Sequence, residues 1–230
     1  MNAPRSSPDA GAQAPRLRLQ ALHRLHVGPI DLSLCPGECI SVMGASGAGK
    51  SVLLRMIADL DPHEGQAWLD GVASTAMSAP LWRRQVTYVP AESGWWDDRV
   101  APHFAPDFDF ARWLPMLALD PAARDWPVAR LSTGERQRLA LLRAIRAGVT
   151  RVLLLDEPTS GLDPEAVECV ERLLAMQQHA HGVAIILVTH AQAQADRMAS
   201  RQYRLESGQL AAVHAADVPA NLSVQGVQIA

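Results

Sequence analysis

The clearest chemistry in the sequence belongs to a glycine-rich run at residues 43–51, which reads M-G-A-S-G-A-G-K-S and fits the pattern G-x-x-x-x-G-K-[ST]. Its glycines permit positive φ and let main-chain N–H groups approach phosphate oxygens without an intervening Cβ. Lys50 adds a positive charge for the β/γ end of a polyphosphate, and the Ser51 hydroxyl can ligate Mg²⁺. The run therefore predicts a nucleotide-binding loop. The residues expected to contact the nucleotide are Gly44, Ala45, Ser46, Gly47, Ala48, Gly49, Lys50, Ser51 and Val52.

Two acidic residues follow an apolar run later in the chain. Residues 152–155 (V-L-L-L) are typical of a central parallel strand covered on both faces, and Asp156 and Glu157 stand at its C-terminal end. Open α/β sheets bind their ligands at that edge. Adjacent carboxylates there are costly unless a cation or a reacting proton justifies them. We therefore expect Asp156 to be a ligand of Mg²⁺ or of its water, like Ser51, and Glu157 to be the general base for a water attacking the γ-phosphate.

A histidine ends a second strongly apolar run. Residues 184–188 (A-I-I-L-V) predict another buried strand, which Thr189 and His190 follow. An isolated histidine at a strand end is usually structural, but this one is expected at the same sheet edge as the two carboxylates. We assign it a catalytic role beside Lys50 and Glu157.

The elements that must position these residues can be predicted from hydrophobic spacing and turn residues. A strand at 38–43 and a helix at 52–60 flank the glycine-rich run, which is the order that aims a helix N-terminus at a phosphate. Residues 17–34 predict two strands with Gly28-Pro29 as the turn between them. Further strands are expected at 66–69 and 85–89, helices at 108–119, 134–147 and 164–176, and a closing hairpin at 201–205 and 210–213.

Composition excludes several classes of protein. The 230 residues are 48% hydrophobic and 20% charged, as in an ordinary globular protein of one or two domains. No run approaches the roughly 18 apolar residues of a membrane span, and the N-terminus has no apolar signal-peptide core. A net charge of −3 gives no electrostatic basis for wrapping nucleic acid. Three cysteines without a C-x-x-C pair favour a reducing compartment over a disulfide or zinc framework.

The order of motifs resembles that of the ATP-binding cassette (ABC) family over about residues 17–213. The run L-S-T-G-E at 131–135 is similar to the family's L-S-G-G-Q signature, and S-G-L-D at 160–163 matches its D-loop. The resemblance implies an α/β fold: a P-loop NTPase (RecA-like) core with a mixed sheet and an inserted helical subdomain. It divides the chain into a nucleotide-binding lobe at 16–90 and 148–214 and a helical signature subdomain at 91–147. Residues 1–15 mix Pro, Ser, Ala and Gly without periodicity and predict a disordered leader, and residues 215–230 form a tail without a firm pattern.

The resemblance also implies cofactors and partners. ATP and Mg²⁺ would be held between two cassettes paired head to tail, each completing the other's site with Ser132, Gly134 and Glu135. A homodimer is the simplest such pairing. The two cassettes would drive conformational changes in a transmembrane permease encoded on a separate chain. Binding to this permease would place the protein on the cytoplasmic face of the membrane. No direct contact with nucleic acid or with the bilayer is expected.

Several positions depart from the family pattern. Ala91 stands where a glutamine is expected after residues 85–89, with Glu92 as a substitute shifted by one residue. Thr133 and Glu135 replace a glycine and the glutamine of the signature. The aromatic residue that would stack on adenine is missing, and either His23 or His26 could supply a flat ring.

A tryptophan pair, Trp95-Trp96, follows the altered glutamine position. Two exposed tryptophans would form a costly apolar patch, so the pair is either buried in the helical insert or docked against a partner; we expect the partner. Two alternatives to a transporter subunit remain: a soluble ABC ATPase acting on DNA or ribosomes, and a regulatory cassette that hydrolyses ATP slowly. The short insert and the lack of a basic patch oppose the first, and the intact Lys50, Glu157 and His190 oppose the second.

Overall fold

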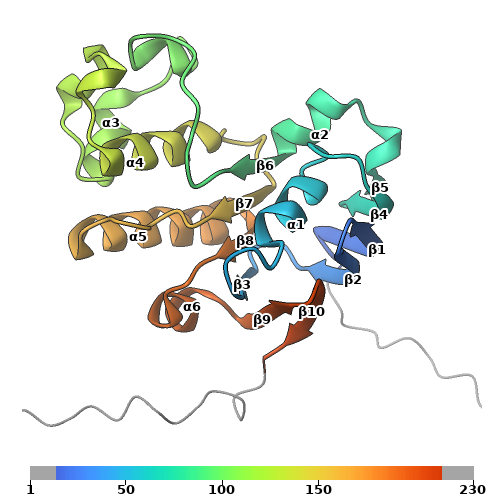
Figure 1. Cartoon of the computed structure of the whole chain (residues 1–230). Coiled ribbons are helices and arrows are strands. Elements are labelled where there is room, and N and C mark those ends of the chain that lie inside the picture. The colour runs from blue at the N-terminus through green and yellow to red at the C-terminus, as the bar shows by residue number, and fades with distance from the viewer. Residues whose placement is uncertain (1–13, 214–230) are drawn as a thin grey trace, which may run out of the picture.

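The computed structural model describes residues 14–213, which form two β-sheets and the helices that cover them (Figure 1). The leader and tail predicted at 1–15 and 215–230 lie, apart from Ala14 and Pro15, outside the described residues. Among residues 14–213, no helix has both the length and the apolar character that crossing a bilayer requires.

The larger sheet has six strands in the order β10-β9-β3-β8-β7-β6. All neighbours pair in parallel except β9 and β10, which form the predicted hairpin. Its parallel strands point the same way, so the loops that follow β3, β7 and β8 meet at one edge. The strands are β3 (Cys39–Met43), β6 (Val86–Val89), β7 (Val152–Asp156), β8 (Ala184–Val188), β9 (Arg201–Glu206) and β10 (Gln209–Ala212).

The smaller sheet is antiparallel, in the order β2-β1-β4-β5. It contains β1 (Leu17–Arg24), β2 (Val27–Leu34), β4 (Glu64–Leu69) and β5 (Val72–Ala73). The predicted pair of strands at 17–34 is confirmed, but the prediction that Gly28-Pro29 is their turn is wrong. The chain turns at Leu25-His26, and Gly28-Pro29 lies inside β2. Gly28 has a φ of +105°, its N–H donates to Gly208 O at 2.8 Å, and a Cβ there would lie 2.4 Å from Leu22 O. Glycine is required by this close crossing and not by a turn.

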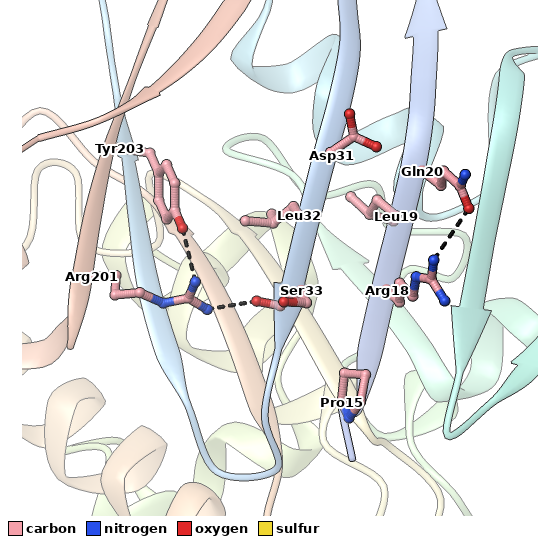
Figure 2. Close-up of a pocket in the computed structure, with 9 residues that line it drawn as sticks. All are labelled: Pro15, Arg18, Leu19, Gln20, Asp31, Leu32, Ser33, Arg201 and Tyr203. Carbon is pink, nitrogen blue, oxygen red and sulfur yellow. Dashed lines mark hydrogen bonds between the residues drawn. The ribbon is translucent and has the colours of Figure 1, made fainter. Parts of the chain in front are cut away.

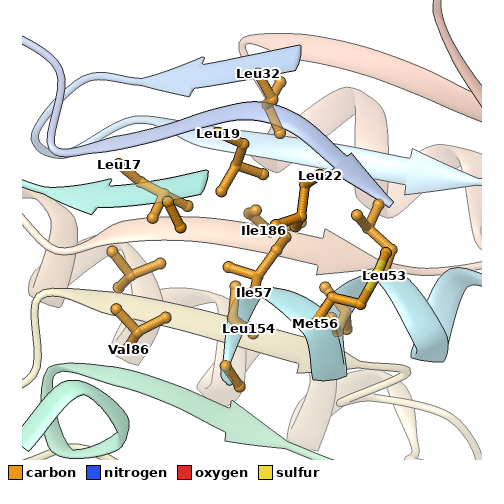
Figure 3. Packing of buried hydrophobic residues seen from close by; sticks show 14 of the residues in the cluster. Leu17, Leu19, Leu22, Leu32, Leu53, Met56, Ile57, Val86, Leu154 and Ile186 are labelled. Carbon is orange, nitrogen blue, oxygen red and sulfur yellow. The ribbon is translucent and has the colours of Figure 1, made fainter. Parts of the chain in front are cut away.

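Side chains of successive residues in the central strands enter two different cores. Leu154 of β7 and Ile186 of β8 pack between the two sheets, together with α1 (Lys50–Ile57), as Figure 3 shows. Leu153 and Leu155 instead face the opposite side of the sheet, toward α5 (Pro164–His181). This alternation explains why these strands read as unbroken apolar runs, since both of their faces are buried.

The predicted helical insert holds α3 (Phe110–Met116), α4 (Thr133–Ala144) and three 3₁₀ helices, and Figure 1 shows it standing to one side of the large sheet. α3 is shorter than the predicted 108–119, because Asp109 caps it and Pro115 lies in its last turn.

Two further helices were not predicted, α2 (Ala79–Gln85) and α6 (Gln192–Met198). Gln85, predicted to begin a strand, ends α2 instead. The three 3₁₀ helices of the insert are η2 (Ala101–His103), η3 (Pro121–Asp125) and η4 (Val128–Arg130), and η1 (Ser74–Ala76) lies ahead of α2.

Candidate nucleotide site

The glycine-rich loop joins the end of β3 to the start of α1. Lys50 is only 8% exposed, and its ammonium donates to the carbonyl oxygens of Gly44 and Ala45, at 2.8 and 2.9 Å. Gly49 has a φ of +101°, and a Cβ there would lie 2.2 Å from the side chain of Val27. The loop therefore packs directly against β2, while the segment from Ala45 to Gly47 is exposed. Lys50 is also the only lysine among the 230 residues.

The start of α1 faces the end of β7. Ser51 Oγ donates to Asp156 Oδ2 at 2.6 Å, and Asp156 is 6% exposed. The same carboxylate oxygen accepts a hydrogen bond from Tyr88 Oη of β6 at 3.0 Å. Burial and then the Asp156 carboxylate raise the pKa of Tyr88, so its hydroxyl stays protonated and donates.

These donors suit Mg²⁺. A hydroxyl and a carboxylate oxygen stand together, and Mg²⁺ usually takes one or two carboxylates along with phosphate and water oxygens. Within residues 14–213, no group of three or more His, Cys, Asp or Glu side chains is arranged to hold a metal. Ser51 and Asp156 would supply two of the oxygen ligands, and the others would come from phosphate and water.

Glu157 begins the loop after β7 and has a φ of +51°, which is rare for a residue with a side chain. Its N–H donates to Val188 O at 3.0 Å, and its carbonyl oxygen accepts a hydrogen bond from Gln137 Nε2 at 2.6 Å. These two bonds fix the direction of the side chain, and Glu157 Oε1 lies 3.2 Å from His190 Nε2. Burial raises the pKa of Glu157, and the nearby His190 partly opposes that rise. A carboxyl with a raised pKa beside a histidine is suited to accept a proton.

The residues predicted to complete a neighbouring site lie at the start of α4. Ser132 Oγ accepts from Glu135 N at 3.2 Å, while Glu135 Oε2 accepts from Ser132 N at 2.7 Å. This is a capping box, so the carboxylate of Glu135 lies at the N-terminus of α4. A Cβ at Gly134 would lie 3.0 Å from Leu162 in the D-loop. Lys50, Asp156, Glu157 and His190 thus converge on one sheet edge, whereas the residues at 132–135 belong to the insert.

The structure also shows the surroundings of the residues that depart from the family pattern. Ala91 and Glu92 are exposed in the loop after β6. His26 lies beside Gly49, with its Nε2 3.2 Å from where a Cβ on that glycine would be, whereas His23 faces Glu64 at 3.6 Å. His26 is thus the histidine of the two that neighbours the phosphate loop.

The two tryptophans of the pair differ in burial. Trp95 is half-buried and packs against the core of the insert, while Trp96 is 69% exposed. Both rings contact His103, and the guanidinium of Arg143 lies 5.0 Å from the Trp95 ring centre and 4.8 Å from that of Trp96. Trp96 and Arg143 border a pocket of about 330 Å³ beside β6.

A second pocket, of about 640 Å³, lies between β1, β2 and β9, away from these residues (Figure 2). Its arginines are already bound to neighbours: Arg201 donates to Tyr203 Oη at 2.9 Å, and Arg18 to Gln20 at 3.3 Å. This pocket plays no part in the candidate site.

Sequence reasoning missed two side chains of the site, Tyr88 and Gln137. Their partners are 68 and 20 residues away along the chain, so no local pattern indicates these contacts.

Known proteins resemble this chain in sequence. The ABC transporter family matches residues 27–160, more than half of the chain. Protein STAR1 of Oryza sativa is 32% identical over 222 residues, covering 89% of this chain and 64% of its own length. The Fe(3+) ions import ATP-binding protein of Pseudomonas fluorescens is 35% identical over 218 residues, covering 84% and 60%. The chain thus spans less than two thirds of the length of these two relatives.

A solved structure agrees in fold. The dimeric post-hydrolysis state of an ATP-binding cassette bound to ADP and Pi superposes with a TM-score of 0.67 at 22% identity, covering 84% of this chain and 96% of that one. This likeness confirms the predicted fold, a P-loop NTPase core with a mixed sheet and added helices. The family match, over more than half of its length, shows that the chain belongs to the ABC transporter family.

Proposed function

We propose that this protein binds and hydrolyses ATP as the nucleotide-binding subunit of an ABC transporter. The observation that carries the proposal is the convergence of a phosphate loop, a buried Asp156 and the Glu157–His190 pair on one edge of the large sheet. This edge is where parallel α/β sheets place their ligands. The P. fluorescens relative is an import ATP-binding protein by name, which supports the same role.

The residues divide the chemistry between them. The loop N–H groups and Lys50 bind the phosphates, and Mg²⁺ held by Ser51 and Asp156 would neutralise charge on the β- and γ-phosphates. Glu157 accepts the proton of the attacking water, since its carboxylate is half-buried and its raised pKa makes it a better base. His190, whose Nε2 lies 3.2 Å from Glu157 Oε1, stands beside that carboxylate and adds hydrogen-bonding capacity toward the γ-phosphate.

The second half of each site would come from another cassette, most simply a second copy. Ser132 and the N-terminus of α4, which lie in the helical insert, would form the anion site that each copy offers to the other. The cassette with a TM-score of 0.67 is itself a dimer with ADP and Pi, which supports this pairing. ATP would then hold two copies together, and its hydrolysis would release them.

A charge change at α4 tests this pairing. The Glu135 carboxylate lies at the helix end that would receive a γ-phosphate, and like charges there repel. Glu135→Gln keeps an acceptor for Ser132 N–H and removes the charge. We expect ATP-dependent dimers to become about two- to fivefold tighter, as measured by light scattering with a non-hydrolysable ATP analogue.

Glu168→Gln, an acid on the outer surface of α5, is the matched control and should leave dimerisation unchanged. If the Glu135→Gln protein dimerised with equal or weaker affinity, the helix end would not be the second phosphate site. If the parent protein stayed monomeric with ATP at all concentrations, the ATP-driven pairing would be wrong.

The pocket beside β6 is the proposed docking site for the permease. Trp96 is its exposed aromatic residue, and none of the ion pairs formed within residues 14–213 includes its Arg84, Arg143 or Arg146. This surface therefore suits a partner segment with an apolar side chain and acidic neighbours. Through such a permease alone the protein would reach the cytoplasmic face of the membrane.

Changing Trp96 to Ser should separate docking from nucleotide binding. The side chain is 69% exposed, so we expect folding and ATP affinity to be unchanged. Stimulation of ATP hydrolysis by the co-purified permease should be lost, because an aromatic anchor is removed. Val72→Ser, at a 45% exposed apolar position on the small sheet, is the control. Full coupling in the Trp96→Ser protein would exclude this pocket as the docking site.

A further inference from the structure

The hydroxyl of Tyr88 reaches the buried carboxylate of Asp156 from a neighbouring strand. β6 and β7 pair in parallel, with Tyr88 opposite Leu154, so the tyrosine stands two positions before the strand end where Asp156 lies. Its Oη lies 3.0 Å from Asp156 Oδ2, the oxygen that also accepts the hydrogen bond from Ser51 at 2.6 Å. One carboxylate oxygen thus accepts from two hydroxyls on two different elements.

The ring of Tyr88 is held in place independently of this hydrogen bond. It is partly buried and packs against the core between the two sheets. The hydroxyl therefore comes to Asp156 from a fixed position, with little conformational entropy lost in forming the bond. In the loop after β6, Ala91 offers only a methyl group and Glu92 is exposed.

We propose that Tyr88 is a positioning residue that holds Asp156 ready for the divalent cation. An ionised carboxylate accepts several hydrogen bonds, so two donors on Oδ2 fix its orientation and leave Oδ1 available. Ser51 is itself a proposed metal ligand, so Tyr88 is the donor whose only role here is to orient the carboxylate. The inference rests on the proposed role of Asp156 in binding Mg²⁺.

Metal binding, and not turnover, gives the direct test. Mn²⁺ takes the same oxygen ligands as Mg²⁺, and its free concentration can be read by electron paramagnetic resonance in the presence of saturating ADP. Tyr88→Phe keeps the packed ring and removes the hydroxyl. We expect Mn²⁺ to bind the ADP complex about tenfold more weakly, while ADP affinity without metal stays unchanged.

Two further variants separate the possible failures. Tyr203→Phe removes a tyrosine hydroxyl on β9, where it bonds Arg201, and should leave Mn²⁺ affinity unchanged. Asp156→Asn should weaken Mn²⁺ binding far more than Tyr88→Phe does. If Asp156→Asn has no effect, the metal site itself is wrong; if it weakens binding but Tyr88→Phe does not, only the positioning role is overturned. An unchanged melting temperature of Tyr88→Phe shows that the fold is retained.

Discussion

Glu157→Gln is expected to lower the rate of ATP hydrolysis by about a hundredfold to ten-thousandfold, the contribution typical of a positioned general base. The amide has nearly the same shape as the carboxylate but cannot accept the proton of the attacking water. Nucleotide binding should remain, because the phosphate loop and the Ser51–Asp156 pair are untouched. Radioactive phosphate release measures the rate, and gel filtration with ATP should show a dimer that no longer dissociates.

The pH dependence of the parent protein supplies the check. The folded-state pKa of Glu157 is raised, so activity should fall on acidification at a higher pH than an exposed glutamate would give. Stability depends on pH in the opposite direction to activity. A raised folded pKa means that the protein is stabilised by this group at low pH and loses that contribution as the pH rises through the folded value. Glu157→Gln should therefore be at least as stable as the parent at neutral pH. Parental turnover in this variant would remove Glu157 as the base.

Lys50→Ala should weaken ATP binding by about ten- to a hundredfold, the loss typical of a charge-assisted hydrogen bond. The ammonium is the only side-chain cation on the phosphate loop, and it also bonds the carbonyls of Gly44 and Ala45. Its removal therefore takes away both the positive charge and the two hydrogen bonds that hold the loop in its conformation. Isothermal titration with ATP and Mg²⁺ measures the affinity.

A matched control for Lys50 lies on the same helix. Arg55 is an exposed cation of α1 that pairs with Asp61 at 2.7 Å, and Arg55→Ala should leave ATP affinity unchanged. Circular dichroism would show whether either variant is folded. A folded Lys50→Ala protein with parental affinity would contradict the assignment of the phosphate loop.

The reach of sequence reasoning is clearest in β7. Its unbroken apolar run predicted a central strand, and the structure confirms this: Leu153 and Leu155 enter one core and Leu154 the other. Because Asp156 and Glu157 directly follow this run, they were expected at the C-terminal edge of the sheet. Where one local pattern dominates, as here and in the phosphate loop, the sequence was sufficient for the fold.

Features set by distant parts of the chain were not predictable in this way. Gly28-Pro29 has the residues of a turn, yet a hydrogen bond to Gly208, 180 residues away, keeps it within a strand. Tyr88 and Gln137 look like ordinary residues of a strand and a helix, and only the folded arrangement brings them to Asp156 and Glu157. Local propensity does not report such long-range partners.

The single lysine has a practical consequence for anyone who studies the assembly of this protein. Apart from the amino terminus, the chain presents no primary amine except the shielded one of Lys50, because every other basic side chain besides histidine is a guanidinium. Aldehyde and succinimidyl ester cross-linkers would therefore have only the amino terminus and this one shielded amine through which to link associated copies. The same reagents become a selective footprint, since acylation at Lys50 and its suppression by added nucleotide would report occupancy of one loop only.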